Sequence, residues 1–503
     1  MRSKEKRRKF VEEPRLLKMS DKLTEIVIYF MIIFSPWAFG STESWSIWTM
    51  NYSAFALGLL LIIKTITRLF TRYEPWEKKR KNTLNLKQKR LNLINKICNI
   101  TLLLSMFLLL AYILTSAINA RASFNLQSHE YTFFEGFNKA LPHSYDAQAT
   151  WSVFWQYLGL IIVFWAIRDW AKGALKDPQI LNSINPRIKQ LIFLFCINGG
   201  VLALLSIIQR SYYDGQNGRL LFLIEPTMNI SSNTHFGPFA YRSNAASFLN
   251  LVWPICLGLF MSLSHENLGQ RKKRFGNGPE MILIPILILC LIGTIISTSR
   301  GGSLVMLGLL AITTILIIFK KSSTKSIRFT LIFSLFLGLT GSIYFGWDAL
   351  ESRLMNIFTD KMSNRTYIYE VTNKMISEYP IFGSGPGSFE TVAQFELGGT
   401  FPFWESWAHN DYLEFILTFG KYGTLIIILL AAVISLQAII GIFFTNNRNL
   451  LIYGLVALIG ISIHAFRDFP LQVHSILFSI VLITAIISTS SNEDHYKVYL
   501  TKK

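Results

Sequence analysis

The chain has 503 residues, of which 51% are hydrophobic and 16% are charged. A water-soluble domain of this length carries more charge and less apolar sequence, so the composition excludes an ordinary soluble enzyme and favours a membrane protein. The 49 Lys and Arg outnumber the 30 Asp and Glu, which gives a net charge of +19. Taken alone, this excess of positive charge is also typical of nucleic-acid binding.

Apolar runs long enough to cross a bilayer recur along the whole chain. A helix satisfies its own backbone hydrogen bonds in lipid, so we expect a single all-α polytopic membrane domain over 1–503 with about twelve transmembrane helices. The segment 415–444 exceeds one crossing, and Gly420 and Gly423 are expected to break it into a short helix and a span. The predicted spans are 24–39, 47–67, 97–117, 151–170, 188–208, 244–263, 281–298, 302–319, 329–346, 415–444, 450–466 and 473–488.

The basic residues are distributed unevenly between the two sides of this arrangement. With the N-terminus in the cytoplasm, the cytoplasmic segments hold 37 of the 49 Lys and Arg, which satisfies the positive-inside rule at every loop. Both termini are therefore expected in the cytoplasm, as a basic segment at 1–22 and a tail at 489–503. The basic blocks 78–81 and 271–274 are interpreted as topology signals that contact anionic membrane lipids, and no nucleic acid is expected as a partner.

The longest polar stretch, 347–414, is predicted to be a large, partly helical loop on the exterior. A helix is expected from about 364 to 378, because apolar residues recur on one face, and a second short helix is expected over 388–397. The apolar face of the first helix is expected either to lie on the membrane surface or to pack on the spans. Between the helices, 383–387 contains three glycines and is interpreted as a turn rather than a phosphate-binding loop, since no lysine follows it.

Three arginines stand at the expected starts of helices on the exterior side. They are Arg242 before span 244–263, Arg300 before span 302–319, and Arg365 at the start of the loop helix. The unpaired N–H groups and positive dipole end of a helix N-terminus add to a guanidinium in binding an anion. Gly301 and Gly302 are expected to let a ligand approach the backbone beside Arg300. The alternatives for each arginine are contact with lipid phosphate or a structural ion pair.

His409 is the candidate general base. It precedes a helix whose start is interpreted as a capping box from Asp411 to Glu414, and the nearby helix N-terminus and arginines favour a neutral imidazole. The alternative is a surface histidine that bonds to the next turn. An ion pair between Arg467 and Asp468 is an alternative role for Arg467. The residues expected to support the site are Ser299, Asn244, Asn410, Asp411, His464 and Arg467.

No HExxH motif and no acidic metal pair occurs in the exterior loops, so the chemistry is expected to need neither metal nor cofactor, with arginines neutralising charge. The four cysteines fall in four different predicted spans without CxxC spacing. They predict neither a disulfide nor a metal site.

Taken together, these motifs resemble the O-antigen ligase and polymerase superfamily of bacterial inner-membrane glycosyltransferases, and the O-antigen ligases most of all. The resemblance is best from about 235 to 425. It rests on the order and spacing of Gly237-Pro238-Phe239 with Arg242, Ser243 and Asn244, of 299–302, of Arg365 followed by 379–389, and of 409–414 with Gly420 and Gly423. Tyr241 departs from the small polar stretch of many relatives.

The resemblance implies a GT-C-like helical fold in the inner membrane, with its active site at the periplasmic face and the large loop 347–414 in the periplasm. It implies metal-independent transfer of a glycan from an undecaprenyl-pyrophosphate carrier to an acceptor, which for a ligase is lipid A–core. By that likeness Arg242, Arg300 and Arg365 would contact the donor pyrophosphate, and His409 would be the catalytic base.

Four other functions, of three classes, stay open at this point. An O-antigen or exopolysaccharide polymerase and a protein O-oligosaccharyltransferase are alternatives in the same superfamily. A membrane transporter of anions or lipid-linked sugars is an alternative of another class, and a non-catalytic scaffold of an envelope assembly is a third. The lack of an internal repeat argues against the transporter.

Overall fold

The computed structural model describes residues 13–73, 86–125, 128, 130–173, 184–212, 218–225, 234–269, 278–320, 324–355, 365–397 and 406–491. The basic blocks 78–81 and 271–274 lie outside these residues. So do much of the predicted N-terminal segment 1–22 and nearly all of the predicted tail 489–503.

The described residues form helices almost throughout, and nine of these helices are long and apolar enough to cross a membrane. The all-α polytopic class is therefore confirmed, and each of the twelve predicted spans coincides with a helix. The last two have 17 residues each, and α7 has 14 residues that follow a 3₁₀ turn at Pro279–Ile282. The helices are α1 (Arg15–Trp37), α2 (Ser44–Thr71), α3 (Leu86–Ile118), α4 (Ala147–Lys172), α5 (Pro186–Tyr212), α6 (Arg242–Gly269), α7 (Leu283–Ile296), α8 (Arg300–Phe319), α9 (Lys325–Met355), α10 (Arg365–Glu378), α11 (Phe389–Leu397), α12 (Asp411–Phe444), α13 (Arg448–His464) and α14 (His474–Ser490).

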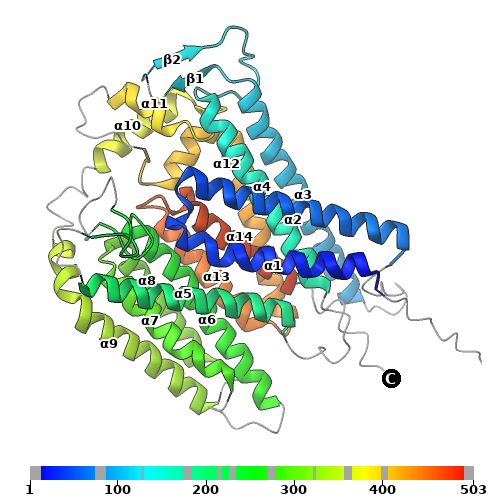
Figure 1. The fold of residues 1–503 in the computed structure, drawn as a ribbon, viewed down its shortest axis with the longest axis vertical. Coiled ribbons are helices and arrows are strands. Elements are labelled where there is room, and N and C mark those ends of the chain that lie inside the picture. Colours follow the sequence, from blue (N-terminus) through cyan, green and yellow to red (C-terminus); the bar gives the residue numbers. More distant parts are fainter. Residues whose placement is uncertain are drawn as a thin grey trace, which may run out of the picture.

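Helix α6 lies at the centre of its half of the bundle, packed against α5, α7, α8 and α13, and almost all of its apolar window is buried. Helix α9 packs on α7 at the periphery (Figure 1). At one end of the bundle α10 and α11 lie beside a hairpin of β1 (Ala122–Asn125) and β2 (Glu130–Phe133), which the sequence did not predict (Figure 1).

The two helices predicted in the large loop are confirmed at 365–378 and 389–397, close to their predicted bounds. The apolar face of α10 packs on protein, since Ile368 and Met375 are buried in a cluster with Phe389, Ala408 and Leu417. Of the two alternatives for this face, packing on the protein therefore applies, and contact with the membrane surface does not. Helix α9 continues to Met355, past the predicted start of the loop at 347, while its apolar span ends at Trp347.

Pro36 lies inside α1, and a neighbouring span supplies the hydrogen bond that the helix loses there. A proline has no N–H, so the carbonyl of Ile32 loses its intrahelical partner. The side chain of Asn198 on α5 donates to that carbonyl at 3.0 Å, and the indole of Trp37 donates to the Asn198 oxygen at 2.7 Å. One amide thereby joins α1 to α5 at the proline.

The predicted break in α12 is confirmed at Gly420, whose φ of 59° and ψ of −170° suit glycine alone, whereas Gly423 keeps the helix. The glycine turn 383–387 fills this break. The N–H of Ser384 donates to the carbonyl of Leu417 (2.8 Å), and that of Gly385 donates to the carbonyl of Thr418 (3.0 Å). The turn therefore satisfies the backbone of a broken span, which confirms its interpretation as a turn.

Candidate functional site

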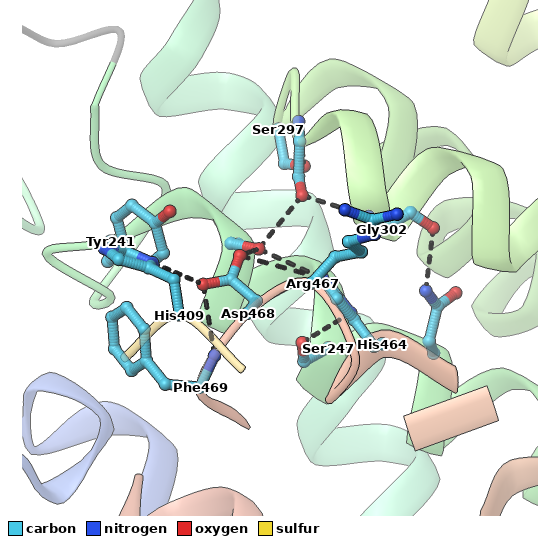
Figure 2. A network of polar contacts seen from close by, with 12 residues as sticks. Tyr241, Ser247, Ser297, Gly302, His409, His464, Arg467, Asp468 and Phe469 are labelled. Atoms are coloured by element: carbon cyan, nitrogen blue, oxygen red, sulfur yellow. Dashed lines mark hydrogen bonds and ion pairs between the residues drawn. The ribbon is translucent and has the colours of Figure 1, made fainter. Parts of the chain in front are cut away.

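Four segments that are distant in sequence meet at one polar network (Figure 2). They are the starts of α6 and α8, the residues 406–410 before α12, and the loop 465–473 between α13 and α14, with the first residue of α10 at its edge. The segments around Arg242, Arg300, Arg365 and His409, to which the sequence analysis assigned the site, all contribute to this network.

Asp468 lies at the centre of the network and is only 4% exposed. Its carboxylate accepts the hydroxyl of Ser243 and the N–H of Phe469 (3.2 Å), and its Oδ1 atom lies 3.4 Å from Nδ1 of His409. Its Oδ2 atom lies 3.9 Å from a guanidinium nitrogen of Arg365. Burial favours the neutral acid, but the charge of Arg365 and the contact with His409 outweigh it and hold the pKa of Asp468 well below its ordinary value. Asp468 is therefore a buried carboxylate that stays ionised.

His409 is oriented by three contacts. Because Asp468 accepts only, its proximity to Nδ1 favours the tautomer with the proton on Nδ1, which leaves the lone pair on Nε2. The backbone of His409 has a φ of 51°, rare for a residue with a side chain, and Tyr369 donates its hydroxyl to the His409 carbonyl at 2.8 Å. The ring of Phe469 meets the imidazole edge-on at 5.0 Å. An imidazole held in this way by a carboxylate is suited to accept a proton at Nε2.

His464 forms the inner side of the network and is 1% exposed. Its Nε2 lies 3.1 Å from the hydroxyl of Ser243 and its Nδ1 lies 2.8 Å from the hydroxyl of Ser247. Since Ser243 uses its own proton for Asp468, Nε2 of His464 is the donor and Ser247 donates to Nδ1. The hydroxyl of Ser299 also donates to Ser243, at 3.2 Å. His464 and Ser299 thus fix the serine that fixes Asp468.

The three predicted arginines Arg242, Arg300 and Arg365 are the first residues of α6, α8 and α10. Arg242 and Arg300 directly adjoin in sequence the hydrogen-bonded pair Ser243 and Ser299, so their backbones lie close together. Both are half-buried. The starts of α6 and α8 therefore lie side by side, and Arg365 at the start of α10 reaches them through its hydrogen bond to Tyr241.

Arg365 is paired with protein groups. One terminal nitrogen donates to the hydroxyl of Tyr241 (3.0 Å) and approaches Asp468, and the other donates to the carbonyl of Arg467. Burial disfavours the charged form, but Asp468 and Tyr241 raise the pKa of Arg365 above its ordinary value. The ion-pair alternative therefore applies to Arg365, and Asp468 pairs with it across the site. The nitrogen that donates to the carbonyl of Arg467 carries a second N–H group.

The turn between α7 and α8 holds Arg300 in place. Ser299 caps α8 by accepting from the N–H of Gly302 (3.1 Å), and Thr298 has a φ of 57° that is strained for a β-branched residue. A side chain at Gly302 would lie 2.3 Å from the methyl group of Ala246 on α6. Gly302 therefore serves close approach of two helices, rather than the ligand approach expected from the sequence.

The start of α12 differs from its prediction. Asn410, not Asp411, is the capping residue, and its side chain accepts two backbone N–H groups of the first turn. Asp411 is buried and accepts from the N–H of Leu471 (2.9 Å), while Glu414 accepts from the N–H of Ala408 (2.9 Å). The predicted capping box is therefore wrong. Asp411 instead joins α12 to the loop 465–473, and Glu414 joins α12 to the segment before it.

Of the remaining predicted residues, Asn244 is buried in the first turn of α6, where its N–H donates to the carbonyl of Tyr241 at 3.0 Å. Arg467 is exposed and contributes its carbonyl to Arg365. Among the described residues, no group of three or more His, Cys, Asp and Glu could hold a metal ion.

Sequence reasoning missed Asp468 as the centre of the site, and it missed Ser247, Tyr369 and Phe469. For one of them, Ser247, the sequence does contain a signal. Ser243, Ser247 and Asn250 form a polar stripe with helical spacing in an apolar span, and such a stripe indicates a buried polar partner.

An apolar cavity of about 470 Å³ lies among α3, α4, α12, α13 and α14. Phe466 and Leu471, from the loop that carries Asp468, line it together with side chains such as Leu109, Phe164, Ile434 and Leu477. The polar site therefore adjoins space that suits a hydrocarbon chain.

A family model described as O-antigen ligase matches residues 285–428. The resemblance to the O-antigen ligase superfamily is confirmed. The segment that matches the O-antigen ligase model includes Arg300, Arg365 and His409, while Arg242 and Asp468 lie outside it. No curated protein matches the chain. The chain is thus a multi-pass membrane protein in which residues 285–428 are similar to the O-antigen ligase family, and this similarity supports a glycosyltransferase-type function.

Proposed function

We propose that this protein transfers a glycan from an undecaprenyl-pyrophosphate carrier to an acceptor hydroxyl at the periplasmic face of the bacterial inner membrane, with lipid A–core as the acceptor. The observation that carries the proposal is the His409–Asp468 pair beside the arginines at the starts of α6, α8 and α10. This arrangement combines a proton acceptor with a site for a diphosphate, the two elements that the transfer requires.

The reaction is a single displacement. Nε2 of His409 takes the proton of the acceptor hydroxyl, and the acceptor oxygen forms a bond to the anomeric carbon of the donor sugar. The bond between that carbon and the phosphate oxygen breaks, and its electron pair leaves with the pyrophosphate. Asp468 stabilises the imidazolium that forms, because it remains ionised and lies 3.4 Å from Nδ1.

The leaving group needs charge stabilisation rather than a proton, because pyrophosphate is a stable anion. Arg242 and Arg300 are the proposed contacts, with Arg365 adding a further donor from the edge of the site. A hydrogen bond to a charged group contributes about 1.5–3 kcal/mol, so two such contacts supply several kcal/mol where the negative charge develops.

The polyisoprenoid chain of the carrier has to stay in an apolar environment while its diphosphate is at the site. The apolar cavity between α12, α13 and α14 is the proposed place for it, since Phe466 and Leu471 connect its wall to the loop of Asp468.

A transfer assay tests the proposed function. The full chain is purified in detergent and supplied with a lipid-linked glycan and lipid A–core, and both products are measured by mass spectrometry. We expect glycan attached to the core together with free undecaprenyl pyrophosphate. Movement of the donor across vesicles without this product would instead support the transporter, and donor joined to donor would support the polymerase.

Paired arginine variants separate site contacts from general effects of charge. Arg300→Ala should reduce transfer strongly, whereas Arg219→Ala should leave it unchanged. Arg219 is the matched control because it is exposed and paired with Glu225 outside the network. Equal activity of both variants would remove Arg300 from the donor site.

A further inference from the structure

Three aromatic rings stack beside His409. Phe469 is parallel to Tyr241, with ring centroids 5.2 Å apart and planes at 13°, and parallel to Trp407, at 5.5 Å and 15°. The middle ring is almost fully buried, at 8% exposure. Two parallel neighbours leave this ring a single orientation, because tilting it would press it into one of them.

Phe469 contacts both members of the proposed proton-accepting pair. Its edge-to-face contact with the imidazole of His409 has a centroid distance of 5.0 Å and an interplanar angle of 68°. Its backbone N–H donates to Oδ1 of Asp468 at 3.2 Å, the same oxygen that faces Nδ1 of His409. The side chain of Phe469 thus restricts the orientation of the His409 imidazole, and its main-chain N–H restricts the orientation of the Asp468 carboxylate.

We infer that Phe469 is a positioning residue, which sets the geometry between His409 and Asp468 through the ring stack with Tyr241 and Trp407. The inference rests on the proposed function, in which His409 accepts the proton. The stack itself touches no reacting atom in this account. Its effect reaches the reaction only through the orientation of the imidazole and the carboxylate.

The kinetic test compares two substitutions at one position. Phe469→Leu removes the ring, and Phe469→Tyr keeps it. We expect Phe469→Leu to lower kcat by about 10- to 100-fold without raising KM for the donor, because small displacements of a catalytic group have effects of this size. Phe469→Tyr should restore most of the activity. Phe329→Leu is the matched control, since it removes a ring stacked on Phe333 in the remote helix α9.

A double substitution tests whether Phe469 acts through Asp468. If it does, Phe469→Leu combined with Asp468→Asn should be little less active than Asp468→Asn alone. If the double variant instead loses kcat by the product of the two single losses, Phe469 acts independently of Asp468, and the inference is overturned. A Phe469→Leu enzyme whose kcat matches that of Phe469→Tyr would also overturn it.

A spectroscopic measurement keeps this inference separate from the proposed function. In protein labelled with ¹⁵N-histidine, we expect His409 to show a single Nδ1–H tautomer, assigned by its loss in His409→Gln. Phe469→Leu should show mixed tautomers, and Phe469→Tyr should show one. An unchanged spectrum in Phe469→Leu would refute the positioning role, whatever the activity assay finds. Absence of glycan transfer in the unmodified chain would instead refute the proposed function alone.

Discussion

Asp468 and His409 are 59 residues apart in the chain, yet Oδ1 of the first lies 3.4 Å from Nδ1 of the second. Two different helices bring them together, since His409 directly precedes the cap of α12 and Asp468 follows α13. The carboxylate selects the tautomer of the imidazole, and Ser243, Phe469 and Arg365 in turn fix the carboxylate. The remaining groups of the site can be understood from this one relationship.

Asp468→Asn should reduce kcat by about 10²- to 10⁴-fold, because the amide no longer favours the Nδ1–H tautomer and no longer stabilises the imidazolium. The rate of glycan transfer at saturating donor measures this. Asp146→Asn is the matched control, since Asp146 is the N-cap of α4, and asparagine caps a helix equally well. Full activity of Asp468→Asn would show that the pair has no catalytic role.

The stability that Asp468 contributes should persist to low pH. Burial opposes ionisation, but Arg365 holds the pKa of Asp468 below its ordinary value, so the folded protein binds fewer protons here than the unfolded chain. The contribution is complete above the unfolded pKa of about 3.9 and is lost as the pH falls from there through the folded pKa. The difference in Tm between the unmodified protein and Asp468→Asn should therefore be constant from pH 7 to about 5 and shrink below about 4. A difference that disappears between pH 7 and about 5 would contradict this.

Lys64→Met should destabilise the bundle at the opposite end from the site. Lys64 is fully buried between Asp21 (3.2 Å) and Asp169 (2.9 Å), so its loss leaves buried carboxylates with less compensation. Because Arg68 and Arg187 still pair with these carboxylates, we expect the lower end of the usual range for breaking a buried pair, about 3 kcal/mol. Thermal unfolding in detergent measures the effect. Arg219→Ala, which breaks an exposed pair, should cost at most about 1 kcal/mol.

Gly420→Ala should weaken the joint between α12 and the glycine turn. Its backbone conformation costs a residue with a side chain about 1–3 kcal/mol, and a Cβ there would lie 2.4 Å from the nitrogen of Gly383. The loss of unfolding free energy should exceed the backbone cost alone. Gly308→Ala is the control, because α8 has open space there and helical alanine gains about 0.5–1 kcal/mol over glycine. Equal stability of the two variants would contradict the assigned role of the turn.

The spans, the two loop helices and the break at Gly420 could be predicted, because each depends on local sequence. Hydrophobic length, the period of α10 and the freedom of one glycine are visible along a single segment. The positions of Arg242, Arg300 and Arg365 at helix starts could be predicted for the same reason.

Asp468 could not be predicted as the centre of the site, because its partners are distant in sequence. Next to Arg467 in a short loop it resembles one half of a local ion pair, and the pairing with Arg365 depends on how α10 packs. The error at the start of α12 has a similar origin. Asp411 has the chemistry of a cap, and only the tertiary contact with Leu471 shows that it is used elsewhere.

His409→Gln should lose donor cleavage in a single turnover, because His409 is the proposed proton acceptor. Release of undecaprenyl pyrophosphate is followed with enzyme in excess over donor, beside His143→Gln as a control on a histidine outside the network. We expect a loss of about 10²-fold or more for His409→Gln and an unchanged rate for the control. A His409→Gln enzyme that releases the carrier as fast as the unmodified protein would contradict this role of His409.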